Sequence, residues 1–477
     1  MGESGDRGVE LVTALGSWRS GLRTRANPRR FRQDNPMPTL PLRLDRDAPG
    51  PLGVQLSGRI RDLVLAGTLA RGDRLPSTRA LAAELGVSRA VTEQAYEQLL
   101  AEGWLTARRG AGTFVAADGS GRAGVPPRPT PARPGQLVRL DAGTPWIDPR
   151  HAAGWRRAWR EVSTARPPRG YDDPRGLPEL RAALADRLAR TRGLVVHPDE
   201  VAVVNGTTDG LRHLLTASPP GPVALEDPGY RAAVETVRGL GRAVRDLPAL
   251  APVTDLTGVA AAYVTPAHQH PLGRVLPGPE RVALLAAADA AGTLVVEDDY
   301  DSEFRYDVAP VPALASLDRN RVAYLGTAAK SVAPTLRLGW LVAPPELGER
   351  VQARRVVTHE GAPWPVQRAY LALLRDGYVD QVVRTARRVY AERAPRVAAA
   401  LAPYAELAGP LAGMYSTWLL PAGDAVRARD AARGAGFEVN LLADYCRSAT
   451  LTGLVVGFGG VTDEELDRAL SALVSAL

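Results

Sequence analysis

The segments LVVEDDYDSEFRYDVAP (residues 294–310) and VAYLGTAAKSVAPTLRLGWLV (residues 322–342) decide the fold of this chain. Three apolar runs in them, Leu294–Val296, Val322–Leu325 and Leu338–Val342, predict buried strands like those in the sheets of α/β proteins. The acidic cluster Glu297–Asp299 directly follows the first run. Open α/β sheets bind ligands at the carboxyl ends of their strands, so this cluster marks a candidate site.

Lys330 lies between the second and third runs, and it is the single lysine among 59 lysine and arginine residues. A lysine amine can lose its proton and form a Schiff base with an aldehyde, whereas the guanidinium of arginine stays protonated and cannot. A GC-rich coding bias would explain why lysine is rare in this chain. It does not explain why one lysine is present, and a chemical role for Lys330 does.

The residues around Lys330 match the needs of one aldehyde cofactor. Pyridoxal 5′-phosphate (PLP) requires an amine for its aldehyde, an aspartate for its pyridine nitrogen, and a hydroxyl group and an arginine for its phosphate. Asp298 lies 32 residues before Lys330, and Thr327 and Arg337 lie on either side of it. This arrangement resembles the fold-type I aminotransferases, in which an aspartate precedes the Schiff-base lysine at a similar distance.

Length and composition restrict the class of protein. With 477 residues the chain exceeds the roughly 250–300 residues at which single cores stop growing, so we expect more than one domain. Its net charge of +7 suits a polyanionic partner but is a weak indication alone. The single cysteine, Cys446, excludes an internal disulfide, and His268 and His270 lack a nearby third ligand, so we expect no metal site. Without a long apolar run or a secretory start, we expect a cytoplasmic protein with no membrane contact.

Four regions follow from the pattern of the chain. Residues 1–38 are arginine-rich with little apolar periodicity, and we interpret them as a disordered or non-native extension. The alternatives are a nucleic-acid-binding tail or a start at Met37 in place of Met1. Residues 39–116 form a compact module, residues 117–136 are a linker rich in glycine and proline, and residues 137–477 alternate between helical and strand-like patterns.

The module over residues 39–116 has the pattern of a winged helix-turn-helix. Helices are predicted over Gly53–Leu69, over Thr78–Leu85, and from Ser88 to about Glu102, where Val91, Ala95 and Leu99 would face inward. The last two helices are joined by a tight glycine turn, which suits a helix-turn-helix. Two short strands around a basic glycine turn follow, as in a wing. The alternative is a module that serves dimerisation or docking.

The segment LPSTRALAAELGVSRAVTEQAYEQLLAEGWLTARRGAGTFV (residues 75–115) resembles the GntR-type winged helix-turn-helix of bacterial regulators. The family usually has Thr-Val after its Ser-Arg-x sequence, whereas this chain has Val91-Thr92, and Thr92 is carried over as the phosphate-binding threonine. The resemblance implies contacts with double-stranded operator DNA from the two helices and the wing. The residues that it implies are Arg79, Ser88, Arg89, Thr92, Arg108, Arg109 and Gly110.

Residues 137–477 carry further aminotransferase-like segments. The strand Val201–Val204, followed by a glycine turn and a helix start, suits a phosphate, since a helix N-terminus offers free N–H groups. The loop TPAHQHPLG (residues 265–273) resembles that of the MocR/GabR subfamily, in which a GntR-type domain is fused to an aminotransferase-like domain. The resemblance implies a multidomain α/β protein. Its second part would be a fold-type I domain with an α/β/α large domain and a small C-terminal α+β domain.

The same resemblance assigns the site residues. Lys330 would form the Schiff base, Asp298 would pair with the pyridine nitrogen, and Tyr300 would bond the phenolic oxygen of PLP. Tyr171 would reach the phosphate of the partner copy, which implies a homodimer. The implied cofactor-binding residues are Lys330, Asp298, Tyr300, Gly206, Thr207, Tyr230, Thr327, Arg337 and Tyr171.

Two functions of different classes remain open from the sequence. One is a transcriptional regulator that senses PLP, or an amine or amino-acid effector, through Lys330. The other is a PLP-dependent aminotransferase with an appended DNA-binding domain. Transamination usually requires an arginine near the C-terminus for the substrate carboxylate, and the matching position here is Val455. The loss of that charge-assisted contact favours the regulator.

Overall fold

The computed structural model describes residues 40–46, 50–108, 110–117, 137–147, 149–307 and 311–477. The predicted extension over residues 1–38 and nearly all of the predicted linker lie outside these ranges. The chain divides into two compact units, Met1–Pro131 and Ala132–Leu477, and the division falls within the predicted linker. Among the described residues, no helix has both the length and the apolar composition that crossing a bilayer requires.

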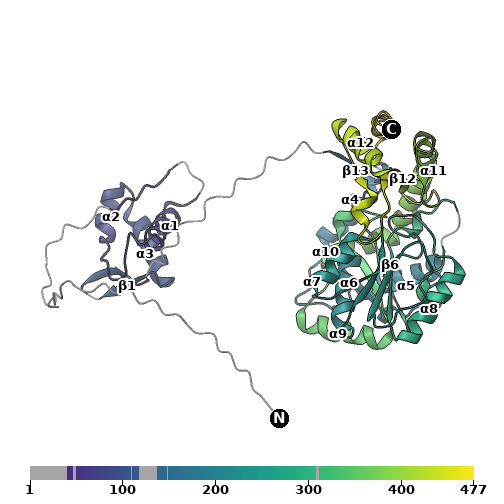
Figure 1. Cartoon of the computed structure of the whole chain (residues 1–477). Coiled ribbons are helices and arrows are strands. Elements are labelled where there is room, and N and C mark those ends of the chain that lie inside the picture. The colour runs from purple at the N-terminus through teal and green to yellow at the C-terminus, as the bar shows by residue number, and fades with distance from the viewer. Residues whose placement is uncertain (1–39, 47–49, 109, 118–136, 148, 308–310) are drawn as a thin grey trace, which may run out of the picture. The chain divides into compact units, whose positions relative to one another are not determined.

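The described part of the first unit contains three helices and a hairpin (Figure 1). Their bounds are α1 (Leu52–Leu65), α2 (Thr78–Leu85), α3 (Arg89–Ala101), β1 (Leu105–Arg108) and β2 (Gly112–Val115). α1 and α2 both contact α3. Leu56, Ile60, Leu81 and Leu99 lie in one shared core. The helix-turn-helix with a wing, predicted from the sequence, is confirmed.

Caps and turns set the ends of these helices. The Ser77 hydroxyl accepts a hydrogen bond from the Ala80 N–H at the start of α2, and Gly86 ends α2 with a left-handed φ of 62°. The predicted first helix begins one residue late and ends four residues beyond the end of α1. The helix ends at Leu65 because Gly67, with a φ of 73°, turns the chain there.

The inward face of α3 differs from the prediction by one position. Ala95 and Leu99 are buried as expected, but Val91 is half-buried while Thr92 is fully buried. The Thr92 hydroxyl donates to the carbonyl oxygens of Thr78 (2.9 Å) and Arg89 (2.8 Å). A polar side chain is tolerated in this core because its one donor is satisfied.

The second unit is built on a mixed sheet. Its strands among the described residues are β4 (Val201–Val204), β5 (Val223–Asp227), β6 (Val244–Pro248), β7 (Ala261–Val264), β8 (Leu294–Asp299), β9 (Val322–Thr327) and β10 (Gly339–Val342). They are ordered β4-β10-β9-β8-β7-β5-β6. β10 is antiparallel to both of its neighbours, whereas β9, β8, β7, β5 and β6 pair in parallel.

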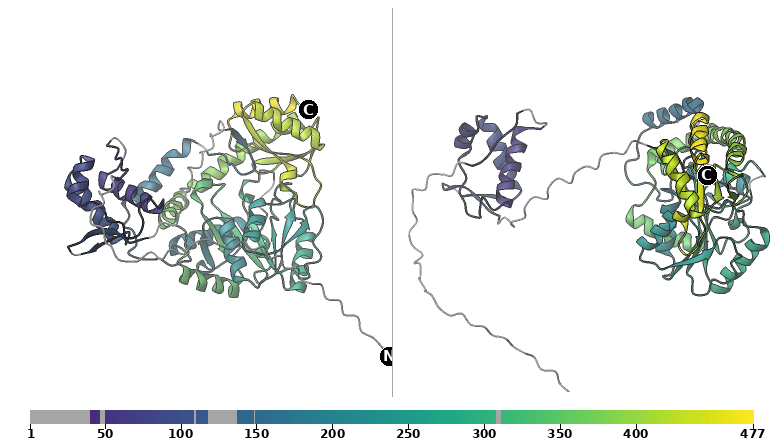
Figure 2. Two further views of the ribbon diagram at one scale, coloured as in Figure 1. Left: turned by 60° about the vertical axis from the view of Figure 1, so that its left-hand side comes forward. Right: turned by 45° about the horizontal axis from the view of Figure 1, so that its top comes forward.

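Helices cover both faces of this sheet, as the two views of Figure 2 show. The helices are α5 (Pro178–Arg192), α6 (Thr207–Ala217), α7 (Arg231–Gly239), α8 (Gly278–Ala291), α9 (Pro345–Thr358) and α10 (Trp364–Arg375), and α4 (Ala152–Thr164) packs against α10. Apolar side chains of α5 and α8 pack with Val203 and Val295 on one face. Those of α6, α7 and α9 pack with Val204 and Val296 on the other. Neighbouring residues of each strand thus pack against helices on opposite faces of the sheet.

A smaller sheet lies in the C-terminal part of the second unit. Its described strands, in the order β11-β12-β14-β13-β3, are β11 (Glu406–Leu407), β12 (Tyr415–Leu419), β14 (Gly453–Gly457), β13 (Phe437–Leu441) and β3 (Val138–Leu140). The accompanying helices are α11 (Tyr378–Leu401), α12 (Ala422–Gly434) and α13 (Asp463–Val474). The predicted α/β/α large domain and small α+β domain are therefore confirmed.

Candidate functional site

A cavity of about 390 Å³ lies at the carboxyl ends of β7, β8 and β9. It brings together every residue that the sequence predicts to bind a cofactor except Tyr171. The predicted residues that line it are Gly206, Thr207, Tyr230, Asp298, Tyr300, Thr327, Lys330 and Arg337. Residues from distant parts of the chain thus meet in one place, as expected where the strands of an α/β sheet end.

Lys330 follows β9 and points into this cavity. Its Nζ donates a hydrogen bond to the Gly143 carbonyl oxygen at 2.5 Å. Burial lowers the pKa of the Lys330 ammonium, and the carboxylates of Asp301, Asp141 and Asp298 act in the opposite direction. A lowered pKa raises the fraction of neutral amine, which is the form that attacks an aldehyde.

Asp298 ends in the same cavity with one oxygen atom free. The Tyr263 hydroxyl donates to Asp298 Oδ2 at 2.5 Å. Asp298 Oδ1 is buried and accepts no hydrogen bond from the described residues. Burial raises the pKa of Asp298 to about 7, and the hydrogen bond from Tyr263 opposes this change. A buried carboxylate oxygen without a donor suits a ligand that brings an N–H group, such as a protonated pyridine nitrogen.

A second group of residues forms a cradle for an anion. α6 begins directly after Gly206, so the unpaired N–H groups of its first turn are available at this end of the helix. Arg337 has a left-handed φ of 50°, and its Nη2 lies 3.3 Å from the Thr208 hydroxyl. A Cβ added at Gly206 would lie 3.5 Å from that guanidinium. The Thr327 hydroxyl also faces the cavity, which completes a set of groups suited to a phosphate.

Aromatic side chains line the remaining wall. The Tyr230 ring meets His270 edge-on, with ring centroids 5.6 Å apart. The Tyr300 hydroxyl donates to the His268 carbonyl oxygen at 2.9 Å and lies 2.8 Å from the Tyr415 hydroxyl. His268 and His270 do not act as a pair, since His268 Nδ1 bonds Asp301 at 2.7 Å. Within the described ranges, no group of three or more His, Cys, Asp or Glu residues could hold a metal ion.

Tyr171 lies apart from this cavity. Its side chain is 82% exposed, and its ring stacks on that of His359 with centroids 4.1 Å apart. Tyr171 therefore takes no part in the pocket of its own chain.

Sequence reasoning missed several residues of the pocket. Tyr263 lies on β7, and Asp141 lies in the segment after β3, where its carboxylate accepts hydrogen bonds from the Gly143 N–H and the Thr144 hydroxyl. Asn440 and Tyr445 reach the pocket from the small sheet and its following turn. Asp141, Asn440 and Tyr445 carry no sequence signal of their own, because their role depends on which elements meet. For Tyr263, a tyrosine within an apolar strand was the one available hint.

Most of the predicted DNA-binding residues lie on the surface of the first unit. Arg79, Ser88, Arg89, Arg108 and Gly110 are exposed, and Arg109 lies outside the described residues. Arg89 forms an ion pair with Glu93 at 2.7 Å, and Gly110 has the left-handed φ of 77° that the wing turn requires. The prediction for Thr92 needs correction. With no exposed surface and its hydroxyl bonded inside the domain, this residue holds α2 against α3 and offers no phosphate contact.

Comparisons with known proteins agree with both units. Residues 52–115 match the family model of bacterial regulatory proteins of the gntR family. Residues 136–473 match the model of aminotransferase class I and II. A similar relative is the HTH-type pyridoxine biosynthesis transcriptional regulator PdxR of Corynebacterium glutamicum, 33% identical over 92% of this chain and 98% of that protein.

The chain belongs to the MocR/PdxR subfamily of GntR-type transcriptional regulators. A second relative with similar identity is the probable rhizopine catabolism regulatory protein MocR of Rhizobium meliloti, which is 33% identical over 91% of this chain and 95% of that protein. Among solved structures, an archaeal alanine:glyoxylate aminotransferase is similar, with a TM-score of 0.64 and 25% identity over 71% of this chain and 90% of the other. As a member of this subfamily, the chain combines a DNA-binding domain with an aminotransferase-like domain.

Val455 is the position to which the sequence analysis assigned the carboxylate-binding arginine of aminotransferases. Val455 lies in β14, paired across the sheet with Thr417 and Asn440, and it is fully buried. The position where the sequence comparison expected a carboxylate-binding arginine is thus part of the apolar core. No cation projects from it toward the pocket.

Proposed function

We propose that this protein is a regulator whose aminotransferase-like domain binds PLP at Lys330, and that the occupancy of this site changes the affinity of the winged domain for double-stranded operator DNA. One observation carries the proposal. The unpartnered Oδ1 of Asp298 and the amine of the half-buried Lys330 face the same cavity. A ligand that satisfies both must present a hydrogen-bond donor at one point and an amine-reactive carbon at another, and PLP does so.

The cofactor-binding residues predicted for this pocket, together with Tyr263, each have a part in this proposal. Asp298 would bond the pyridine nitrogen, and the hydroxyl of Tyr263 would keep the Asp298 carboxylate in place. Arg337, Thr327, Gly206 and Thr207 would hold the phosphate, Tyr230 would stack on the ring, and Tyr300 would bond the phenolic oxygen. When bound, PLP supplies an aldehyde that condenses with a primary amine, and its ring accepts electrons.

Efficient transamination is not favoured. An amino-acid substrate needs a cation for its carboxylate, and a charge-assisted hydrogen bond contributes about 1.5–3 kcal/mol. The buried Val455 cannot supply one at the position where aminotransferases have an arginine, whereas Arg139 and Arg231 line the pocket at other positions. The signal would therefore be PLP itself, or an amine or amino acid that other groups hold.

A homodimer is part of the proposal. Tyr171 cannot reach the pocket of its own chain, because it is exposed and stacked on His359. In a dimer it would reach the phosphate bound by the second copy. Ligand binding would then favour one arrangement of the domains, and the differential affinity of those arrangements would change operator binding in the cytoplasm.

The single lysine allows a direct test. The protein is mixed with PLP and reduced with borohydride, which makes the attachment between cofactor and amine permanent, and its intact mass is measured. We expect the mass of one bound cofactor per chain in the wild type. The matched control is Lys330→Arg, which keeps the charge and removes the only lysine side chain. It should gain no cofactor at this site.

A parallel titration connects the pocket to DNA. Binding of a fluorescent duplex from the region upstream of the gene is measured with and without PLP, for the wild type and for Lys330→Arg. We expect PLP to change the DNA affinity of the wild type alone. Cofactor attachment without any change in DNA affinity would reject the coupling, and an equal mass gain in both proteins would reject the site.

A further inference from the structure

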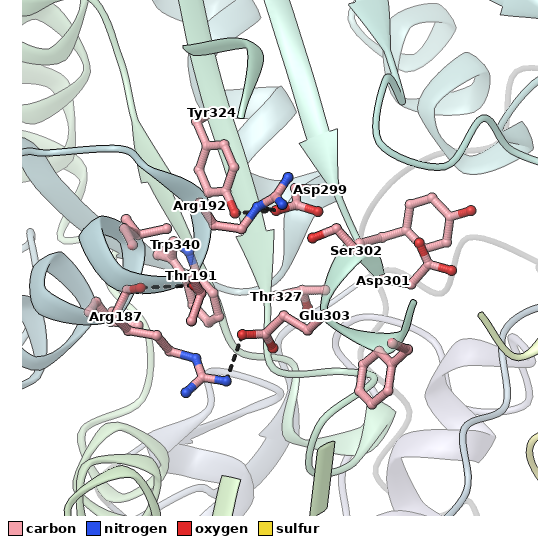
Figure 3. Close-up of a pocket in the computed structure, with 14 residues that line it drawn as sticks. Arg187, Thr191, Arg192, Asp299, Asp301, Ser302, Glu303, Tyr324, Thr327 and Trp340 are labelled. Carbon is pink, nitrogen blue, oxygen red and sulfur yellow. Dashed lines mark hydrogen bonds and ion pairs between the residues drawn. The ribbon is translucent and has the colours of Figure 1, made fainter. Parts of the chain in front are cut away.

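A small second cavity shares Tyr300 and Thr327 with the PLP pocket proposed above (Figure 3). Its volume is about 20 Å³. It lies between the end of α5 and the segment that follows β8. Asp298 lies at the end of β8 and Tyr300 directly follows this strand, so the residues around this small cavity adjoin one wall of the PLP pocket.

Charged groups at this cavity are paired and deeply buried. Arg192 Nε and Asp299 Oδ2 lie 2.5 Å apart, and the Tyr324 hydroxyl donates to the same Asp299 oxygen. Figure 3 shows these three side chains together, with a second ion pair between Arg187 and Glu303 (2.6 Å) on another side of the cavity.

Six buried side-chain atoms of the residues that line this cavity nevertheless have no hydrogen-bond partner among the described residues, and three of them are Arg187 Nε, Arg192 Nε and Trp340 Nε1. The other three are Nη2 of Arg192, Oδ1 of Asp299 and the hydroxyl oxygen of Ser302. The exposed fractions of these residues are 1%, 8% and 1%, so bulk solvent does not reach them freely. The first atom can only donate a hydrogen bond, the second can only accept one, and the third can do both. Such atoms rarely stay unpaired in a protein interior.

We propose that one buried water molecule binds in this cavity and joins Arg192, Asp299 and Ser302. A water molecule needs roughly 10–15 Å³ by the same measure and two to four polar partners, so the cavity holds one. The mixture of donors and acceptors suits a molecule that donates and accepts. The guanidinium groups of Arg187 and Arg192 disfavour a cation, and the carboxylates of Asp299 and Glu303 disfavour an anion.

This water molecule would help to position the end of β8 and the residues that follow it, which line the PLP pocket. Ser302 begins the short 3-10 helix Ser302–Phe304, directly after the segment with Asp298 and Tyr300, and Arg192 ends α5. A water molecule that bonds both Ser302 and Arg192 would hold the segment after β8 against α5. This positioning role rests on the proposed function, because it is measured by the affinity for PLP. The presence of the water molecule can be tested without PLP.

The direct test is a crystal structure of the full chain without PLP, at a resolution that shows ordered waters. We expect one density peak within hydrogen-bond distance of Arg192 Nη2, Asp299 Oδ1 and Ser302 Oγ. Absence of a peak, or a peak with the anomalous signal of an ion, would overturn the proposal. This result is independent of whether PLP binds.

Variants test the positioning role. Ser302→Ala removes one partner of the water, and we expect PLP to bind roughly 2- to 10-fold more weakly, measured by the absorbance of bound cofactor. Ser302→Cys, with a weaker donor, should lie between Ser302→Ala and the wild type. The matched control is Ser316→Ala, since the Ser316 hydroxyl bonds within its own turn to the Ala313 carbonyl oxygen. Equal PLP affinities for Ser302→Ala and Ser316→Ala would reject the role of the water.

Discussion

At the scale of single residues, the candidate site depends on side chains held by one another. Asp298 is fixed by Tyr263, and Tyr300 is fixed by Tyr415 and by the His268 carbonyl oxygen. These bonds form without a ligand, so the Asp298 carboxylate needs little rearrangement to meet PLP, whereas the Tyr300 hydroxyl must turn its one proton from the His268 carbonyl oxygen to the phenolic oxygen. Such preorganisation strengthens binding, because fewer side chains must be ordered when the ligand arrives.

Tyr263→Phe tests this arrangement. The substitution removes the donor to Asp298 Oδ2 and keeps the packing of the ring in the sheet. A hydrogen bond to a charged group contributes about 1.5–3 kcal/mol, so we expect PLP affinity to fall at least about tenfold. The measurement is a titration with PLP followed by absorbance. Tyr404→Phe, at an exposed position, is the control, and an equal effect of both substitutions would speak against the role of Tyr263.

Asp298→Asn tests the effect of pH on the protein without PLP. Burial raises the pKa of Asp298 from 3.8 to about 7, so the folded protein binds more protons than the unfolded chain between these values. The free energy of unfolding should therefore fall as pH rises through this window, and the neutral asparagine removes this contribution. We expect urea unfolding to show that the variant gains stability relative to the wild type at pH 8 but not at pH 4.

Two other carboxyl groups with raised pKa values have little effect on the stability difference between the wild type and Asp298→Asn. Glu297 is buried and Glu226 is half-buried, burial raises the pKa of each to about 7, and both are present in the wild type and the variant. Their contributions largely cancel in the difference. A stability difference that does not change with pH would show that Asp298 has an ordinary pKa.

At the scale of helices and strands, the residue before a helix can either stabilise the helix or contact a ligand. A serine occupies the N-cap position directly before α2 and directly before α3, but the two serines differ in their hydrogen bonds. The Ser77 hydroxyl accepts the Ala80 N–H at 3.1 Å, whereas the Ser88 side chain makes no capping bond. Ser88 is also exposed at the start of the helix expected to meet DNA.

Ser77→Ala and Ser88→Ala should separate these roles. Loss of the cap at Ser77 should cost about 1 kcal/mol of local stability, seen as faster hydrogen exchange of the α2 amides in the full chain. Ser88→Ala should leave that exchange unchanged and weaken binding to operator DNA. Faster exchange in both variants, or weaker DNA binding in neither, would contradict this division.

Most elements that position the site could be predicted from the sequence, because their patterns are local. The buried strands β8, β9 and β10 follow from continuous apolar runs, and the start of α6 follows from the glycine after β4. The burial of Thr92 and the role of Tyr263 could not be predicted. Both depend on partners in other elements, and a sequence pattern does not show which elements meet.

At the scale of the whole molecule, the proposed homodimer makes a prediction about mixed subunits. Lys330→Ala and Tyr171→Ala damage the same pocket from two different chains, if Tyr171 serves the second copy. Dimers that contain one chain of each kind would then keep one intact pocket. We expect such mixed dimers, isolated with two different tags, to bind one PLP per dimer with the affinity of the wild type.

The two homodimers are the controls for this experiment. Lys330→Ala alone should attach no PLP, and Tyr171→Ala alone should bind it weakly at both pockets. Mixed dimers with no pocket of normal affinity would show that Tyr171 does not act across the interface.

The antiparallel strand β10 has a consequence for how the second unit folds. β9 and β10 are direct neighbours joined by residues 328–338, and this short connection holds both Lys330 and Arg337. The parallel pairs of the same sheet must wait for longer crossover segments to close, which is entropically more costly. We therefore expect the hairpin with the single lysine to be among the first native contacts to form. The rest of the sheet would then assemble beside an anchor that already contains the reactive amine.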